Sequence, residues 1–310
     1  IFLPPMTPPT LAHVACPDAH GGHRMAYWQW GDAAAPHLVV CTHGLSRQGR
    51  DFDVLARALL ARAAAQGQAL RVVCPDVVGR GESDWLKDPM GYQFPTYVGD
   101  MLVLLNTLQA QAPLATFDWV GTSMGGLIGM TLAGMPDLPL PAPLHRLVLN
   151  DVGPVIEWQA LERIGQYLGK AGTFDSVEAA AARMREISAG FGPHSDEQWL
   201  ALSRPMLRPV PGGGWRMHYD PAIAVPYGAL TQQSAADGEA ALRQLYDRVQ
   251  AETLVIRGAD SDLLSAATAQ AMAARGPRLR VVEFVGVGHA PTLVAADLVW
   301  WVLDFLLPAP

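Results

Sequence analysis

The chain has 310 residues, half of them hydrophobic, and a formal net charge of −7 at neutral pH. This composition is typical of a soluble globular protein with a large core. Because the balance is acidic and no dense Lys/Arg stretch could neutralise a row of phosphates, we expect no nucleic-acid partner.

Targeting and redox features favour a cytoplasmic location with no membrane partner. Three cysteines are too few, and odd in number, for a disulfide framework, and Cys41 and Cys74 end apolar runs as buried thiols would. The opening IFLPPMTPPT lacks the basic and long apolar regions of a signal peptide. The late apolar stretch LVWWVLDFLL contains Asp304 and is too short to cross a bilayer.

Short apolar runs recur along the chain and predict strands. The first two, TLAHVAC and MAYWQWG, flank the turn DAHGGH and predict a hairpin. Six more end in or just before Gly, Asp or Ser: HLVVCTHG, ALRVVCPD, FDWVGTS, LHRLVLND, ETLVIRG and LRVVEFVG. Helical patterns lie between them at 53–66, 95–111, 124–135 and 263–275. This alternation predicts an α/β fold: a mostly parallel, doubly wound sheet of about eight strands, with the hairpin as an antiparallel edge.

The alternation breaks after LVLND, which predicts an insertion. Trp158, Leu161, Ile164 and Leu168 are spaced for one helix face. Ser176 and Ser195 are placed to cap further helices, and Ser195 begins a capping box. We therefore predict a helical cap at 154–230 above a core formed by 1–153 and 231–310.

One serine lies in an unusual setting, in FDWVGTSMGG. Gly121, Ser123 and Gly125 form the only Gly-x-Ser-x-Gly of the chain, between a predicted strand and a predicted helix. A tight strand-to-helix turn pushes such a hydroxyl clear of the sheet, and small neighbours prevent backbone clashes. The helix N-terminus then directs N–H groups at an anion formed beside the hydroxyl. We predict that Ser123 is a nucleophile rather than an ordinary helix cap.

A serine nucleophile needs a base, and the base needs an orienting carboxylate. His289 lies in the loop VGVGHAP after the last predicted strand, where the sheet edge would bring it beside Ser123. The loop after the preceding strand, RGADSDLLS, offers Asp260 and Asp262.

These motifs resemble the α/β-hydrolase family, and within it the cap-bearing serine hydrolases of the esterase and meta-cleavage-product hydrolase-like group. The resemblance is carried by HGLSR, PDVVGRGESD, GTSMGG, LNDVGP, RGADSDLLS and GVGHAPTL, which span most of the core in the order of the family. It implies an oxyanion hole formed by the backbone N–H groups of Leu45 and Met124. His43 is then more consistent with a structural role than a catalytic one.

The resemblance leaves the catalytic acid open among three residues. Many relatives carry the acid where this chain has Ser261, with Asp260 and Asp262 on either side. The Ser-Asp pair resembles a subgroup in which the Asp is the acid, so we predict Asp262. Asp260, and Asp151 after the LVLN strand, are the alternatives.

The resulting hypothesis is a serine hydrolase that cleaves a carboxylic ester or related small acyl substrate through an acyl-enzyme on Ser123. The alternatives are hydrolysis of a carbon–carbon bond in a ring-cleavage dienoate or β-diketone, and a non-catalytic hydrolase-like receptor for a small ligand. Arg47 could grip a substrate carboxylate, or it could pair with Asp51 or Asp53 and only brace the loop. We expect no cofactor and no metal, since His20 and His23 lie in a turn without further evident ligands. The oligomeric state is not indicated.

Overall fold

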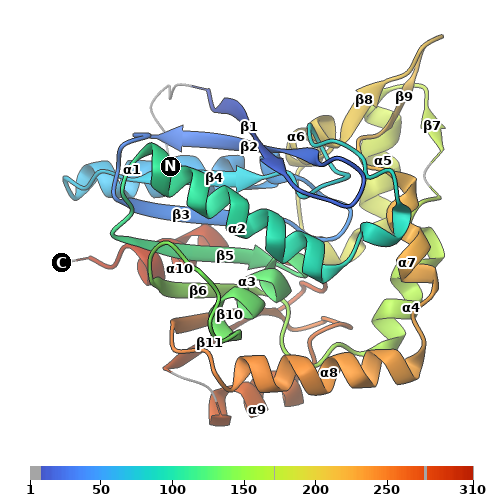
Figure 1. Cartoon of the computed structure of the whole chain (residues 1–310). Coiled ribbons are helices and arrows are strands. Elements are labelled where there is room, and N and C mark those ends of the chain that lie inside the picture. The colour runs from blue at the N-terminus through green and yellow to red at the C-terminus, as the bar shows by residue number, and fades with distance from the viewer. Residues whose placement is uncertain (1–7, 171, 276–277, 310) are drawn as a thin grey trace.

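The computed structural model describes residues 8–170, 172–275 and 278–309, so the first seven residues of the stretch judged unlike a signal peptide lie outside the described residues. An eight-stranded sheet forms the centre of the molecule, in the order β1-β2-β4-β3-β5-β6-β10-β11 (Figure 1). Its strands are β1 (Thr10–Cys16), β2 (His23–Gly31), β3 (His37–Thr42), β4 (Arg71–Pro75), β5 (Thr116–Thr122), β6 (Leu144–Asn150), β10 (Glu252–Gly258) and β11 (Leu279–Phe284).

The sheet has the mixed character that the sequence predicts. β1 and β2 pair antiparallel, β2 joins β4 antiparallel, and every pairing from β4 to β11 is parallel. The inner strands are continuous apolar runs because both of their faces are covered: all five residues of β4 and five of the six in β3 are buried. The predicted hairpin and the parallel sheet are therefore confirmed.

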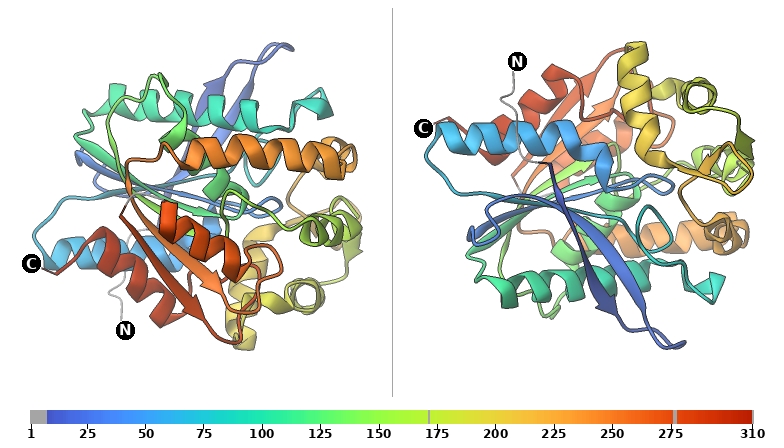
Figure 2. Two further views of the ribbon diagram at one scale, coloured as in Figure 1. Left: turned by 90° about the horizontal axis from the view of Figure 1, so that it is seen from below. Right: turned by 90° about the horizontal axis from the view of Figure 1, so that it is seen from above.

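Helices cover both faces of this sheet. They are α1 (Asp53–Ala65), α2 (Phe94–Gln111), α3 (Met124–Gly134), α8 (Gln232–Tyr246), α9 (Ala266–Arg275) and α10 (Ala296–Leu306). α1 and α10 pack on one face, and α2, α3 and α8 pack on the other (Figure 2). α8 and α10 were not among the predicted helices. Within the described ranges, no helix has both the length and the apolar character needed to cross a membrane.

The segment between β6 and α8 forms the cap, which lies at one end of the sheet (Figure 1). Its helices are α4 (Trp158–Tyr167), α5 (Val177–Ile187), α6 (Asp196–Ser203) and α7 (Ala224–Gly228). As predicted, the side chains of Ser176 and Ser195 cap α5 and α6, and Ser195 completes a capping box. The predicted limits at 154 and 230 fall in the loops on either side of these helices.

The cap predicted as helical at 154–230 contains strands as well as helices. The cap also holds a three-stranded antiparallel sheet of β7 (Thr173–Phe174), β9 (Trp215–Met217) and β8 (Leu207–Pro209). A run of three glycines, 212–214, joins β8 to β9 and takes positive φ throughout. Glycine accepts this conformation without a steric penalty, so the chain can reverse there and pair as a hairpin. The part of the chain that the structure describes also contains five short 3-10 helices: η1 (Gly49–Phe52), η2 (Pro89–Gly91), η3 (Ala189–Phe191), η4 (Arg204–Met206) and η5 (Pro221–Ile223).

Candidate active site

Ser123 occupies a strained turn between β5 and α3. Its φ of 52° and ψ of −117° lie outside the regions that a non-glycine residue usually adopts. A Cβ added at Gly125 would come within 2.0 Å of the Thr42 carbonyl oxygen, and one at Gly121 within 2.3 Å of the Gly125 carbonyl oxygen. The two glycines are therefore required for the close approach of β3, β5 and α3. The strand–turn–helix context that the sequence predicts for this motif is present.

His289 lies in the loop after β11, with one ring nitrogen near Ser123 and the other near Asp151. Its Nε2 is 3.0 Å from the Ser123 Oγ, and its Nδ1 is 2.8 Å from the Asp151 Oδ2. Asp151 directly follows β6 and Ser123 directly follows β5, so all three side chains gather at the carboxyl ends of parallel strands. The three groups form one hydrogen-bonded chain from a hydroxyl through an imidazole to a carboxylate.

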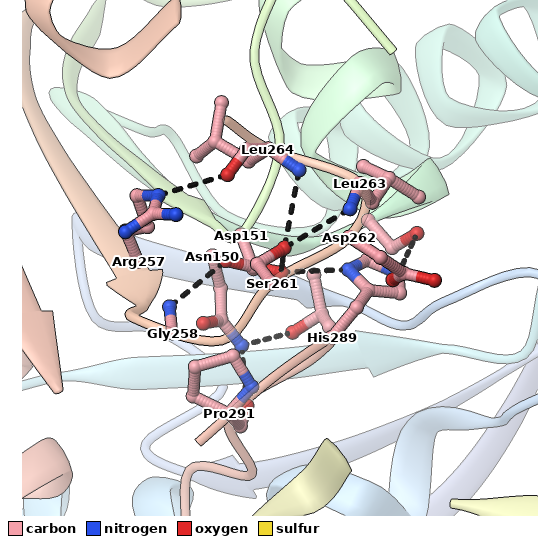
Figure 3. Close-up of polar contacts among 12 residues, drawn as sticks. Asn150, Asp151, Arg257, Gly258, Ser261, Asp262, Leu263, Leu264, His289 and Pro291 are labelled. Carbon is pink, nitrogen blue, oxygen red and sulfur yellow. Dashed lines mark hydrogen bonds and ion pairs between the residues drawn. The ribbon is translucent and has the colours of Figure 1, made fainter. Parts of the chain in front are cut away.

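The prediction of Asp262 as the carboxylate beside His289 is wrong. Asp262 forms a two-point ion pair with Arg163 of α4, at 2.5 and 3.0 Å, and its side chain is 44% exposed. Asp260 is also exposed. The turn after β10 directs Ser261 toward the sheet and its two acidic neighbours away from it, so neither can reach the imidazole. Figure 3 shows Ser261 beside Asp151, with Asp262 to one side of them.

Asp151, the last of the three alternatives, occupies the position predicted for Asp262. It is completely buried, and its Oδ1 accepts a hydrogen bond of 2.9 Å from the Gly258 N–H. Its Oδ2 accepts from the Ser261 hydroxyl at 2.6 Å as well as from His289. Three donors therefore surround one carboxylate. The sequence signal for this role was the position of Asp151 directly after the LVLN strand.

Asn150, next to the carboxylate, links three segments of the site. Its Nδ2 donates to the Thr122 hydroxyl at 3.0 Å and to the Pro291 carbonyl at 2.8 Å. The Asn150 side chain therefore connects the ends of β5 and β6 to the loop that carries His289 (Figure 3).

The two expected oxyanion donors come from different elements: Leu45 lies in the loop after β3, and Met124 begins α3. A Cβ built on Gly44 would lie 3.7 Å from the Ser123 Cβ, which places the Leu45 peptide beside the nucleophile. Met124 is the first residue of α3, so its N–H has no acceptor within the helix. The two N–H groups remain the candidate oxyanion donors of the site.

The peptide between Gly44 and Leu45 is fixed by the side chain of His43. The His43 Nε2 accepts from the Val77 N–H at 3.0 Å, which leaves the proton on Nδ1 to bind the Gly44 carbonyl at 2.7 Å. Since a trans peptide directs its N–H opposite to its C=O, this bond turns the Leu45 N–H away from His43. Burial, with the nearby arginine charges, lowers the His43 pKa to about 3, so the ring stays neutral.

Arg80 supports the same loop from within the core. Its guanidinium is fully buried and donates to the Leu45 carbonyl at 2.8 Å and to the Val78 carbonyl at 2.6 Å. It also contacts the Met124 sulfur at 3.8 Å. Sequence reasoning assigned Arg80 no role, because an arginine in a Gly-Arg-Gly loop carries no local sign of burial.

Arg47 has partners inside the protein. Its guanidinium forms a two-point pair with Asp51, both bonds at 2.6 Å, and donates to the Leu202 carbonyl of α6 at 3.2 Å. Its carbon centre also lies 5.6 Å from the ring of Phe191 in the cap. These contacts favour the alternative in which Arg47 braces the loop over the one in which it grips substrate.

The cap contacts the loop of His289 directly. The Gly288 N–H donates to the Gly190 carbonyl at 2.7 Å. The His194 Nε2 lies 2.5 Å from the Thr292 hydroxyl. The cap therefore packs over the side of the site that carries the imidazole.

Among the described residues, one group could hold a metal ion: Cys16, His23 and Asp100, whose ligand atoms lie within 4.8 Å of one another. Both His23 nitrogens already contact carboxylates, Asp100 at 3.0 Å and Asp18 at 3.1 Å. Burial opposes the charged imidazole, but the two carboxylates outweigh it and raise the His23 pKa. Burial also raises the pKa of the Cys16 thiol well above its usual range. A protonated imidazole between two carboxylates satisfies the group without an ion.

Comparison with known proteins gives concordant findings. The family model described as "Alpha/beta hydrolase family" matches residues 39–299. The chain is 48% identical to a 3-hydroxybutyrate-oligomer hydrolase of Cupriavidus necator, over 92% of this chain and 94% of that protein. A solved putative hydrolase from Rickettsia typhi is 26% identical with a TM-score of 0.82, covering 98% of this chain and 100% of that one. An alpha/beta hydrolase from Novosphingobium aromaticivorans is 33% identical with a TM-score of 0.77 over the same shares.

Proposed function

The chain belongs to the alpha/beta hydrolase family, and we propose that it is a serine esterase that cleaves ester bonds in short oligomers of a hydroxy acid. The hydrogen-bonded chain of Ser123, His289 and Asp151 is the observation that carries the proposal. A hydroxyl, an imidazole and a buried carboxylate in this order are the groups that acyl transfer requires. Asp151 takes the role of acid.

In the first half of the reaction, the Ser123 Oγ attacks the ester carbonyl carbon while the His289 Nε2 takes the hydroxyl proton. The distance of 3.0 Å between these atoms is within range for direct transfer. The negative charge moves to the carbonyl oxygen, where the N–H groups of Leu45 and Met124 stabilise it. As the C–O bond breaks, His289 returns the proton to the leaving alkoxide, and an ester on Ser123 remains.

In the second half, a water molecule gives a proton to His289 and attacks the acyl carbon. The second tetrahedral intermediate uses the same two donors, and its collapse returns the proton to the Ser123 oxygen and releases the acid. In both halves Asp151 holds the imidazole by the bond of 2.8 Å to Nδ1 and balances the charge of the imidazolium.

The proposed substrate class rests on similarity. A relative 48% identical over 92% of this chain is named as a hydrolase of 3-hydroxybutyrate oligomers, whose repeating bond is a carboxylic ester. An ester of this type fits the chemistry of the Ser123 site without a cofactor. We therefore propose 3-hydroxybutyrate dimers and trimers as the first substrates to assay.

The test combines turnover with labelling. Purified protein is incubated with 3-hydroxybutyrate dimer and trimer, and the monomer is quantified; Ser123→Ala is the matched control. We expect monomer release by the wild type alone. When the wild type is treated separately with a serine-reactive phosphonate, we expect one adduct, which mass spectrometry should locate at Ser123. Release by Ser123→Ala, or labelling elsewhere, would remove the serine mechanism. Activity restricted to a dienoate or β-diketone would support carbon–carbon hydrolysis instead, and binding without turnover would support a receptor.

A further inference from the structure

The Ser261 hydroxyl lies at the centre of the turn between β10 and α9, in contact with the proposed catalytic acid. Its Oγ is 2.6 Å from the Asp151 Oδ2. The same oxygen accepts hydrogen bonds from two backbone N–H groups, those of Leu263 at 3.2 Å and Leu264 at 3.1 Å. All three contacts are drawn in Figure 3.

These contacts determine where the hydroxyl proton points. A serine hydroxyl has one proton to donate and two lone pairs that accept. The N–H groups of Leu263 and Leu264 occupy both lone pairs, so the proton is left for the Asp151 Oδ2. The hydroxyl therefore donates in one fixed direction, toward the Asp151 carboxylate.

The carboxylate is thereby held at both of its oxygens by a single turn. Gly258 binds Oδ1 at 2.9 Å and Ser261 binds Oδ2, while the Ser261 N–H donates to the Gly258 carbonyl at 3.0 Å and closes the turn. The plane of the carboxylate is then fixed, with Oδ2 facing His289. Among the described side chains, Ser261 and His289 are the two that donate to the Asp151 carboxylate.

We propose that Ser261 is a positioning residue, which orients Asp151 so that its carboxylate can hold the His289 imidazole. This inference rests on the proposed function, in which Asp151 is the acid. Ser261 itself touches neither the nucleophile nor the reacting atoms, and acts through Asp151.

The first experiment compares Ser261→Ala with Ser265→Ala. Ser265 is a matched control: its hydroxyl lies in the same turn and donates to the Thr268 hydroxyl at 3.0 Å rather than to Asp151. A hydrogen bond to a charged group corresponds to about a ten- to hundredfold effect, so we expect kcat of Ser261→Ala to fall by about that factor with KM nearly unchanged. Ser265→Ala should lower the melting temperature and leave kcat near the wild-type value.

The pH profile gives a readout that a purely structural role would not move. A carboxylate that has lost one donor is more basic, and it holds the proton of the His289 imidazolium more tightly. We therefore expect the acid limb of the kcat/KM profile to shift to higher pH in Ser261→Ala, and to stay in place in Ser265→Ala.

The second experiment moves the carboxylate. Because the Ser261 Oγ is only 2.6 Å from the Asp151 Oδ2, a carboxylate at position 261, which extends one bond further, brings an oxygen toward the place that Oδ2 occupies. The double variant Asp151→Gly/Ser261→Asp empties that place, and glycine tolerates the positive φ of 55° at residue 151. We expect it to regain at least about tenfold in kcat over Asp151→Gly alone.

The outcomes separate this inference from the proposed function. If the wild type hydrolyses the ester and Ser123→Ala does not, the proposed function stands. The role of Ser261 would then be overturned by a wild-type kcat in Ser261→Ala or by an equal loss of kcat in Ser265→Ala. An acid limb of the pH profile that does not move, or no recovery of kcat in the double variant, would overturn it as well. If Asp151→Asn is itself as active as the wild type, the proposed acid is wrong and the role of Ser261 fails with it.

Discussion

Replacing Asp151 by asparagine should nearly abolish turnover while the fold remains intact. The change removes one charge and keeps the shape of a completely buried side chain. Its effect depends on how the new amide is oriented, and the hydrogen bonds of the site decide that orientation.

The Gly258 N–H donates to the Asp151 Oδ1, so the amide oxygen of asparagine must take that position. The opposite orientation would set an NH₂ group against the Gly258 N–H, which is fixed in the backbone, and a buried donor without an acceptor costs about 1–3 kcal/mol. The Ser261 hydroxyl, which meets the NH₂ group in the first orientation, can rotate away from it. The NH₂ group therefore faces the His289 Nδ1, which now has to accept a hydrogen bond. The ring proton moves to Nε2, where it points at Ser123, and the imidazole can no longer take the serine proton.

The same wrong tautomer lowers kcat by about 10⁴ when the acid of a serine protease triad is replaced, which is roughly 5 kcal/mol of transition-state stabilisation. We expect a loss of that size for Asp151→Asn. Asp262→Asn is the matched control, since it removes the same charge from an exposed ion pair, which contributes about 1 kcal/mol or less. Its kcat should stay within about threefold of the wild type.

Steady-state hydrolysis of an activated butyrate ester gives kcat for both variants, and thermal unfolding shows whether each is folded. The reasoning would be refuted if Asp262→Asn lost several orders of magnitude while Asp151→Asn stayed within about tenfold of the wild type. That result would mean that the turn after β10 rearranges on substrate binding and brings Asp262 to the imidazole.

Two further predictions follow from contacts elsewhere in the chain. Arg47→Ala should lower kcat/KM for an anionic and a neutral ester of equal size by the same factor, because the guanidinium is engaged by Asp51; a selective loss for the anionic ester would revive substrate binding by Arg47. The raised pKa of His23 means that its contribution to stability is fully present below its unfolded pKa and is lost as pH rises through its folded pKa. Urea unfolding at about pH 6 and pH 9 should therefore show a larger loss of stability for the wild type than for His23→Asn, and equal losses would contradict it.

The sequence alone was sufficient to predict the sheet, the turn that carries Ser123 and the histidine that lies beside it. Buried parallel strands are continuous apolar runs, and their limits are visible without any knowledge of what they pack against. Ser123 follows one such run inside a pattern that only a tight turn requires, and His289 follows the last of them. Each of these features depends on residues that are neighbours in the chain.

The residue that serves as the proposed catalytic acid could be identified only from the tertiary structure. Asp151, Asp260 and Asp262 all follow strands whose carboxyl ends meet at the same edge of the sheet, so their positions in the chain do not distinguish them. What distinguishes them is the direction of each side chain, which depends on how the turn from Gly258 closes against Asp151 and on Arg163 in the cap, which pairs with Asp262. Neighbouring residues in a turn point in different directions: Ser261 faces Asp151, whereas Asp262, one residue later, faces Arg163 of the cap.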